Sequence, residues 1–539
     1  MTNQREQRER RRRAARRQAA RRRSALVLII VLVVVVILTF AAYTFSELMI
    51  THYEGSLHRG DQIQTQAAVA SGVAMLRLYL QQPPQTLIDS GGVYNNATSL
   101  QNVIVVPGEA GTRQVSVTVL APEIDQADTV VGVRYGLVDE SSKVNLHLLT
   151  WLDGLQEGSG RELLLKLPGM DENIADAILD WLDEDDEPRD FGAELEHYSQ
   201  LDPPYSPTNG PLQRIEDLLL VRGVTPQLLF GADINRNAII DGNEMSGFVG
   251  DTLGSQLLLQ DQQDAEGNIT GSLERGWAAY LTLYSAEAMI NANGEPKIDI
   301  NNDDLELLQE ELSAVFPDPW TTFILAYRQA GPFDGNEAGE KNVTGDLDLT
   351  AGGSNKFSAV LDLIGAKTQV TFEGEEDAVV IASPFEDNPI AMAIYLPSLL
   401  DNVTTVTAPI PGRININQAP RAILLGIPGI EPEIVDAIMQ ARDPTMSADD
   451  ANRYYETWLM VEGIVTLEEM KALNPYICGR GSVFRTQLVG YYQGGGASSR
   501  VEVVIDATGT TPEVLLWKEM SHLGRGYPLD VLGLSLLGQ

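Results

Sequence analysis

An uninterrupted apolar run near the N-terminus restricts what this chain can be more than any other feature of its sequence. From Ala25 to Tyr43 the only polar side chain is that of Thr39. As an α-helix the run extends about 28 Å, at about 1.5 Å per residue, which matches the hydrocarbon core of a bilayer. It is too long for a typical secretory signal, and no small-residue cleavage site follows it. The sequence therefore predicts one transmembrane helix over residues 25–45.

Charge is distributed very unevenly on the two sides of this run. Residues 1–23 contain 11 arginines and two glutamates, whereas residues 24–539 contain 27 basic and 73 acidic residues, a formal charge of −46. Basic flanks remain in the cytoplasm, so residues 1–24 are predicted to be a cytoplasmic basic leader. The acidic bulk is expected across the membrane, where it would repel nucleic-acid phosphates.

Helix and strand patterns divide the remainder of the chain. Residues 46–82 lack proline and continue the helix as an amphipathic half, which ends at Pro83-Pro84. β-branched segments then predict strands near both ends of the region that follows. These segments are Val103–Val106, Val115–Val119, Val130–Val138, Val483–Tyr492, Arg500–Asp506 and Leu515–Trp517.

The order of these elements predicts an α+β, pilin-like fold with a long N-terminal helix and an antiparallel sheet. Residues 46–145 would supply the pilin-like helix and first strands, and residues 476–539 the strands that complete the sheet. Between them, residues 146–475 are expected to form a large, mostly helical insertion.

Two helix-hairpin-helix units are predicted within this insertion. Pro168-Gly169 and Pro428-Gly429 each separate two segments with helical apolar spacing. Such units bind DNA in some proteins, which leaves a membrane-anchored DNA-uptake receptor as an alternative. Acidic residues follow both turns and oppose phosphate, so a packing and protein-contact module without nucleic acid is favoured; these residues are Asp171, Glu172, Glu431 and Glu433.

One segment has the ligand spacing of a calcium loop. Residues 233–244 place oxygen-bearing side chains at positions 1, 3, 5, 9 and 12 and a backbone carbonyl at position 7. The predicted ligands are Asp233, Asn235, Asn237, Ile239, Asp241 and Glu244. Position 6 is Ala238, although the turn there usually requires a positive φ and glycine. A polar turn without metal is the alternative.

No catalytic arrangement is recognisable. The chain lacks Gly-x-Ser-x-Gly, a phosphate-binding loop and His-Glu-x-x-His, and its single cysteine is Cys478. Two further acidic clusters, at residues 180–187 and 299–304, are interpreted either as cation sites or as a solvated turn and a helix cap. We therefore expect that the chain is not an enzyme; a membrane-tethered hydrolase that uses the acidic clusters is the alternative.

Several stretches together resemble type II secretion system protein K, the family of the largest minor pseudopilin. They are the basic tail with its apolar helix, Asp139–His147, Leu167–Asp185, Asn209–Leu212, Leu218–Thr225 and Ile414–Pro420. The resemblance covers nearly the whole chain. It implies a structural assembly protein at the tip of a periplasmic pseudopilus that supports export of folded proteins, in contact with minor pseudopilins I and J, other secretion-system subunits and secreted cargo.

The resemblance also implies a location and a processing step. The location is the bacterial inner membrane, crossed once, with the N-terminus cytoplasmic and the bulk periplasmic. Calcium in the helical insertion is implied as well. Prepilin peptidase would cut at the junction Arg23-Ser24-Ala25, so that the mature chain starts at Ser24 or Ala25, although the peptidase normally requires glycine before the cut. Protein K lacks the glutamate that most pilins carry at position five of the mature helix, and here that position is Ile29.

Overall fold

The computed structural model describes residues 2–108, 114–125, 130–242, 244–246, 273–445 and 451–534. The chain falls into two compact units, residues 1–65 and 66–539. Helix α1 (Thr2–Leu80) contributes to both. The side chains of Ser24 and Ala25, the predicted cleavage site, lie outside the described residues.

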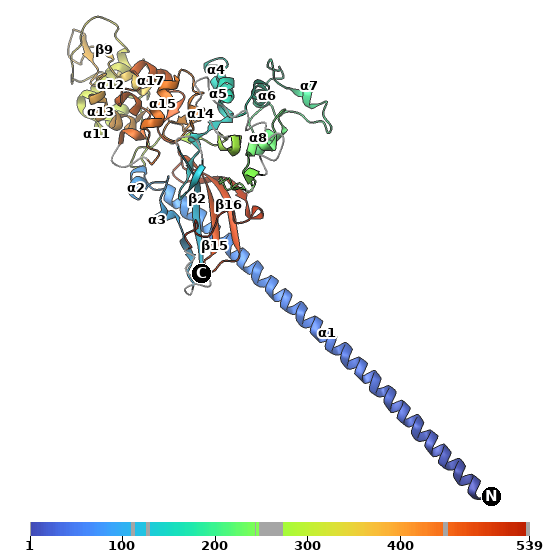
Figure 1. Cartoon of the computed structure of the whole chain (residues 1–539). Coiled ribbons are helices and arrows are strands. Elements are labelled where there is room, and N and C mark those ends of the chain that lie inside the picture. Colours follow the sequence, from blue (N-terminus) through green and yellow to red (C-terminus); the bar gives the residue numbers. More distant parts are fainter. Residues whose placement is uncertain are drawn as a thin grey trace. The chain divides into compact units, whose positions relative to one another are not determined.

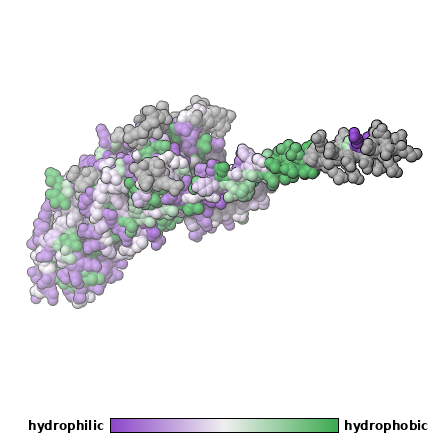
Figure 2. Space-filling view, turned by 90° about the horizontal axis from the view of Figure 1, so that it is seen from below, coloured by the Kyte–Doolittle hydropathy of each residue, from purple (hydrophilic) through white to green (hydrophobic). Residues whose placement is uncertain are grey.

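The first unit is the N-terminal part of α1. Its apolar residues are exposed, with Val34 at 47% and Leu28 at 71%. Among the described residues, one helix is long and apolar enough to cross a membrane, with a mean hydropathy of 3.0 over its most apolar window, none of which is buried. Figure 2 shows this stretch as a continuous hydrophobic band. These properties fit the predicted membrane anchor.

The second unit is built on an antiparallel sheet. Within the described residues, seven strands join in the order β1-β2-β15-β16-β17, with β3 paired to β2 and β4 to β15. The bounds are β1 (Val103–Val106), β2 (Val115–Ile124), β3 (Val130–Arg134), β4 (Val138–Asp139), β15 (Val483–Tyr492), β16 (Ser498–Asp506) and β17 (Glu513–Glu519). Strands from the two ends of the region therefore meet in one sheet, as predicted, where β2 pairs with β15 (Figure 1).

The last turns of α1 cover one face of this sheet. Val69 and Leu76 are fully buried, in a core shared with Val117, Leu488 and Val503. Gly72 permits the close approach, because a Cβ there would lie 2.9 Å from Val117 Cγ1. The helix ends at Leu80, and Pro83 precedes α2 (Pro84–Asp89). The amphipathic half thus packs through the apolar stripe that the sequence predicts.

The C-terminal segment, residues 520–534, lies against the opposite face of the sheet. Tyr527 and Leu532 are buried in a second cluster with Leu120, Val489 and Tyr491, and Ile239 packs against it. Ile239 belongs to the predicted calcium loop. The loop therefore touches the sheet directly.

The region predicted as a mostly helical insertion is a mixture of helices and short strands. Among the described residues, its helices are α4 (Leu149–Leu155), α5 (Ser159–Leu165), α6 (Glu172–Leu182), α7 (Leu195–Tyr198), α8 (Pro226–Phe230), α11 (Leu305–Val315), α12 (Asp318–Ala330), α13 (Pro389–Asn402), α14 (Arg421–Leu424), α15 (Pro432–Ala441), α16 (Trp458–Val461) and α17 (Leu467–Leu473). One large core joins them and encloses Trp181, Trp277 and Trp458.

Two-stranded ladders occur within this region and also join it to the residues on either side of it. They are β5 (Val144–Asn145) with β6 (Leu281–Thr282), β7 (Ala286–Glu287) with β12 (Ile410–Pro411), β8 (Ile298–Asp299) with β11 (Val403–Thr404), β9 (Lys367–Val370) with β10 (Val379–Ala382), and β13 (Ile414–Asn415) with β14 (Ile477–Cys478). Most contain only two residues per strand, which is too short for an alternating apolar pattern to reveal them.

Candidate functional site

The predicted calcium loop closes on itself through its two acidic ends. The carboxylate of Asp233 accepts hydrogen bonds from the backbone N–H groups of Asn237 (3.1 Å) and Ala238 (2.7 Å). The carboxylate of Glu244, at the other end, accepts from the N–H groups of Asn235 (3.1 Å) and Asp241 (3.1 Å). The first and last predicted ligands are thus both turned toward the loop.

The unusual residue at position 6 adopts the conformation that the turn requires. Ala238 has a φ of 61°, in the left-handed region that normally favours glycine. Alanine therefore bends the loop as glycine would, at a cost in strain of about 1–2 kcal/mol.

Replacing Ala238 by glycine is expected to raise the free energy of unfolding by about 0.5–1 kcal/mol. Glycine removes the left-handed strain but adds conformational freedom to the unfolded chain, which offsets part of the gain. Urea denaturation of the two proteins measures the difference. A loss of stability would contradict the positive φ at this position.

The two asparagine side chains of the loop differ in whether their oxygens already accept a hydrogen bond. The side-chain oxygen of Asn235 is buried and accepts no hydrogen bond, whereas that of Asn237 accepts from the N–H of Ile239 at 2.8 Å. Burial, together with the nearby carboxylate of Glu244, raises the pKa of Asp233 to about 6. In the described part of the chain, no three His, Cys, Asp or Glu side chains converge as a metal-binding group. An ion here would therefore depend on amide and carbonyl oxygens as well as the carboxylates.

The acidic cluster at residues 180–187 is bound by a neighbouring arginine. The guanidinium of Arg189 binds Asp180 at 2.8 Å and Asp183 at 2.5 Å. Glu194, which sequence reasoning missed, is 4% exposed, and both of its carboxylate oxygens are buried without a hydrogen-bond partner. Burial and the neighbouring carboxylates, Asp180 first, raise the pKa of Glu194 to about 7. Its side chain is thus a buried acid facing other acids.

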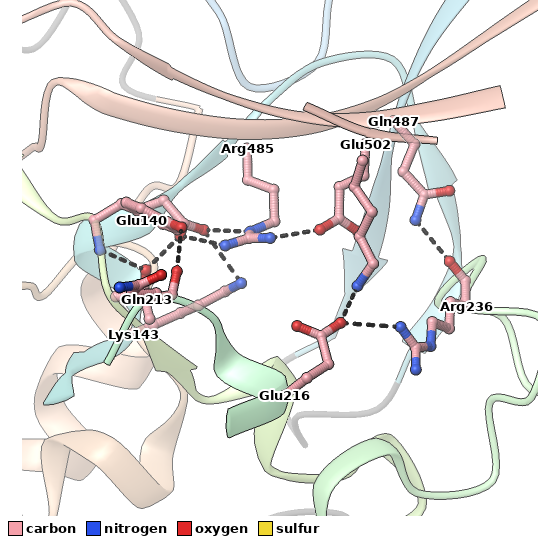
Figure 3. Close-up of polar contacts among 11 residues, drawn as sticks. Glu140, Lys143, Gln213, Glu216, Arg236, Arg485, Gln487 and Glu502 are labelled. Atoms are coloured by element: carbon pink, nitrogen blue, oxygen red, sulfur yellow. Dashed lines mark hydrogen bonds and ion pairs between the residues drawn. The ribbon is translucent and has the colours of Figure 1, made fainter. Parts of the chain in front are cut away.

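A buried ion-pair network lies between the sheet and the insertion (Figure 3). Arg485 on β15 makes two 2.9 Å hydrogen bonds to the carboxylate of Glu140 and one of 2.5 Å to Glu502 on β16. Lys143 lies 3.2 Å from the same carboxylate, whose side chain is 0% exposed. Burial alone would raise the pKa of Glu140, but the two cations lower it to about 2.

The network also has an outer part. Glu216, in a short 3-10 helix (Ile215–Leu220), binds Lys518 on β17 and lies 3.2 Å from Arg236. Arg236 stands at position 4 of the calcium loop, so charged contacts extend from the loop to the sheet edge (Figure 3). Sequence reasoning missed this network because its members come from distant segments, although Glu140 and Lys143 lie within the stretch that carries the family resemblance.

The segment that joins these features has a recognisable family. Residues 142–230 match the model of a known family, type II secretion system protein K. This match confirms the resemblance found in the sequence. This protein K segment includes two members of the ion-pair network, Lys143 and Glu216, and ends three residues before Asp233, the first residue of the predicted calcium loop.

The chain was also compared with curated proteins and with solved structures. No curated protein matches the sequence. One solved structure, the GspK-GspI-GspJ complex of the type 2 secretion system of enterotoxigenic Escherichia coli, aligns over 85% of this chain and 97% of its own, with 12% identity and a TM-score of 0.32. At that score the two folds correspond only loosely.

Proposed function

We propose that this chain is a minor pseudopilin of a type II secretion system. In this role it is a structural assembly protein at the tip of the periplasmic pseudopilus that supports export of folded proteins. The observation that carries the proposal is the protein K segment, residues 142–230. A long apolar helix whose last turns pack on an antiparallel sheet agrees with it, because this arrangement suits a subunit held in the membrane before it enters a filament.

The proposal includes a location and partners. The apolar run of α1 would cross the bacterial inner membrane, with the arginine-rich leader in the cytoplasm and residues 46–539 in the periplasm. Prepilin peptidase would remove the leader at Ser24-Ala25. Pseudopilins I and J are the expected neighbours, other secretion-system subunits lie below, and secreted cargo is a further contact.

The helical units around Pro168-Gly169 and Pro428-Gly429 are proposed to be helix-hairpin-helix modules used for packing rather than for DNA. Both glycines have positive φ, and helices flank both turns. Asp171 caps α6 by accepting from the N–H of Ile174 at 2.9 Å. A carboxylate therefore occupies the helix N-terminus at which a phosphate would bind. No observation favours the DNA-uptake alternative.

Calcium is the proposed cofactor. Asp233, Asn235, Asn237, Ile239, Asp241 and Glu244 would hold it, as the orphaned oxygen of Asn235 and the inward carboxylates support. The ion would supply positive charge that relieves repulsion between Asp233 and Glu244 and would fix the loop.

Partner binding is expected to depend on one face of α1 beyond the membrane. Met49 and Tyr53 are 55% and 66% exposed and lie on one side of the helix, whereas Thr51 and His58 lie on the opposite side. The double change Met49→Lys and Tyr53→Lys should abolish co-purification of the full-length chain with I- and J-like pseudopilins, because it places charge in an apolar helix contact.

The matched control adds the same charge to the polar side. Thr51→Lys with His58→Lys should leave the complex intact. Failure of the unaltered chain to co-purify with either pseudopilin, together with normal secretion after its deletion, would overturn the proposed function.

A further inference from the structure

The calcium loop is held to the sheet through three consecutive backbone carbonyls. The carbonyl of Asn235 accepts from the guanidinium of Arg500, and that of Arg236 accepts from the side-chain amide of Gln487 at 2.6 Å. The carbonyl of Asn237 accepts from the hydroxyl of Tyr527 at 3.0 Å. Each of these donors therefore binds the backbone of positions 3 to 5 of the loop, two of which are ligand positions.

The three hydrogen-bond donors come from two strands of the sheet and from the C-terminal segment. Gln487 lies on β15 and Arg500 on β16, while Tyr527 lies in the C-terminal segment. The hydroxyl of Tyr527 also contacts the side-chain oxygen of Gln487 at 2.9 Å. The loop also donates a hydrogen bond, from the side-chain amide of Asn237 to the carbonyl of Gly526. The attachment is thus reciprocal and involves two strands and the C-terminal segment.

Two of the residues that hold the loop, Arg500 and Tyr527, are buried, so their donor groups cannot turn to water when the loop moves. Arg500 is 0% and Tyr527 4% exposed, and Nε and Nη1 of Arg500 have no hydrogen-bond partner. If the loop moved away, the guanidinium of Arg500 would lose its acceptor, the carbonyl of Asn235, and the hydroxyl of Tyr527 would keep only the side-chain oxygen of Gln487. Docking of the loop therefore provides the acceptor of Arg500 and one of the two contacts of the Tyr527 hydroxyl.

We infer that calcium binding and docking of the loop on the sheet are one coupled event, with Arg500, Gln487 and Tyr527 as positioning residues for the ion. This inference rests on the proposed calcium function. An ion that fixes positions 1 to 12 also fixes the carbonyls of positions 3 to 5, so calcium strengthens the attachment of the insertion to the sheet and the C-terminal segment. By thermodynamic reciprocity, the factor by which calcium strengthens the attachment equals the factor by which the attachment strengthens calcium binding.

Two tyrosines of the same buried cluster provide a matched test. Tyr527→Phe removes the hydroxyl that binds the loop, whereas Tyr491→Phe removes one that donates to the carbonyl of Leu532 and has no contact with the loop. The measurement is calorimetric titration of the metal-free, full-length chain in detergent with calcium chloride. We expect the Kd of Tyr527→Phe to rise about 5- to 10-fold, as loss of one buried hydrogen bond predicts, and that of Tyr491→Phe to stay within about 2-fold.

Hydrogen exchange gives a readout independent of affinity. Adding calcium to the unaltered chain should slow amide exchange in residues 498–506 and 520–534, which contain none of the ligands, and this protection should shrink in Tyr527→Phe. Unchanged affinity of Tyr527→Phe would overturn the coupling and leave the calcium site standing. If both substitutions weakened calcium binding equally, the cause would be a general loss of stability, and this result would also overturn the coupling. Absence of calcium binding by the unaltered chain would overturn both proposals.

Discussion

Glu140→Gln is expected to lower the free energy of unfolding by about 3–5 kcal/mol, the usual cost of leaving buried charges without their partner. The Glu140 side chain is 0% exposed and lies against Arg485 and Lys143, which are 19% and 9% exposed. Glutamine keeps the shape but removes the charge. Both cations would then be left in the interior with only Glu502 nearby, at 2.5 Å from Arg485.

The same residue predicts how stability depends on pH. The pKa of Glu140 is lowered from 4.5 to about 2 in the folded chain. An acid whose pKa falls on folding stabilises the protein fully above its unfolded pKa, and loses that contribution as pH falls through the folded pKa. The difference between the unaltered chain and Glu140→Gln should therefore be largest at pH 5–7 and shrink progressively as the pH falls toward 2.

Urea denaturation followed by tryptophan fluorescence at several pH values measures both effects. An exposed ion pair serves as the control. Glu386 lies 2.6 Å from Lys341, and both side chains are at least half exposed, so Glu386→Gln should cost less than about 0.5 kcal/mol at any pH. A similar small cost for Glu140→Gln would show that the buried network contributes no more than a surface pair.

The calcium loop and the ion-pair network show which contacts can be predicted from the sequence and which cannot. All six predicted calcium ligands fall within twelve consecutive residues, so spacing alone locates them. Glu140 and Arg485 are 345 residues apart, and no local pattern relates them. Only the pairing of β4 with β15, which sets Asp139 opposite Phe484, brings them together.

In the fold, too, local patterns could be predicted from the sequence, whereas pairings between distant segments could not. The N-terminal helix and the strands at both ends follow from long, regular patterns, and residues 103–106 and 483–492 form strands with the predicted bounds. In the insertion, pairs such as Ala286–Glu287 with Ile410–Pro411 depend on contacts across more than a hundred residues. Helical periodicity predicts the helices of this region, whereas strands of two residues leave no pattern of their own.

The attachment of the calcium loop also lay beyond sequence reasoning, for a different reason. Ligand spacing describes which oxygens can surround an ion, but it does not say what holds the backbone that presents them. Arg500, Gln487 and Tyr527 carry no metal-binding signature, since they act on carbonyl groups. The loop therefore serves as a contact between the protein K segment and the sheet, in addition to being a candidate ion site.

Glu244→Gln is expected to remove most of the heat of calcium binding and to raise the Kd at least 100-fold. The residue at position 12 normally gives both carboxylate oxygens to the ion, and an amide offers one oxygen and no charge. In the folded chain those two oxygens accept from the N–H groups of Asn235 and Asp241. Glutamine can replace only one of these bonds, so the loop should also lose some of its order.

Ile234→Ala is the matched control within the loop. Ile234 stands at position 2, offers no ligand, and is 71% exposed, so its removal should leave the Kd within about 2-fold. Titration of the metal-free, full-length proteins with calcium chloride measures both changes, and magnesium chloride tests selectivity. Equal binding by the unaltered chain and Glu244→Gln would reject residues 233–244 as the site. Loss of binding in Ile234→Ala would instead mean that loop folding, rather than ligand chemistry, controls the response.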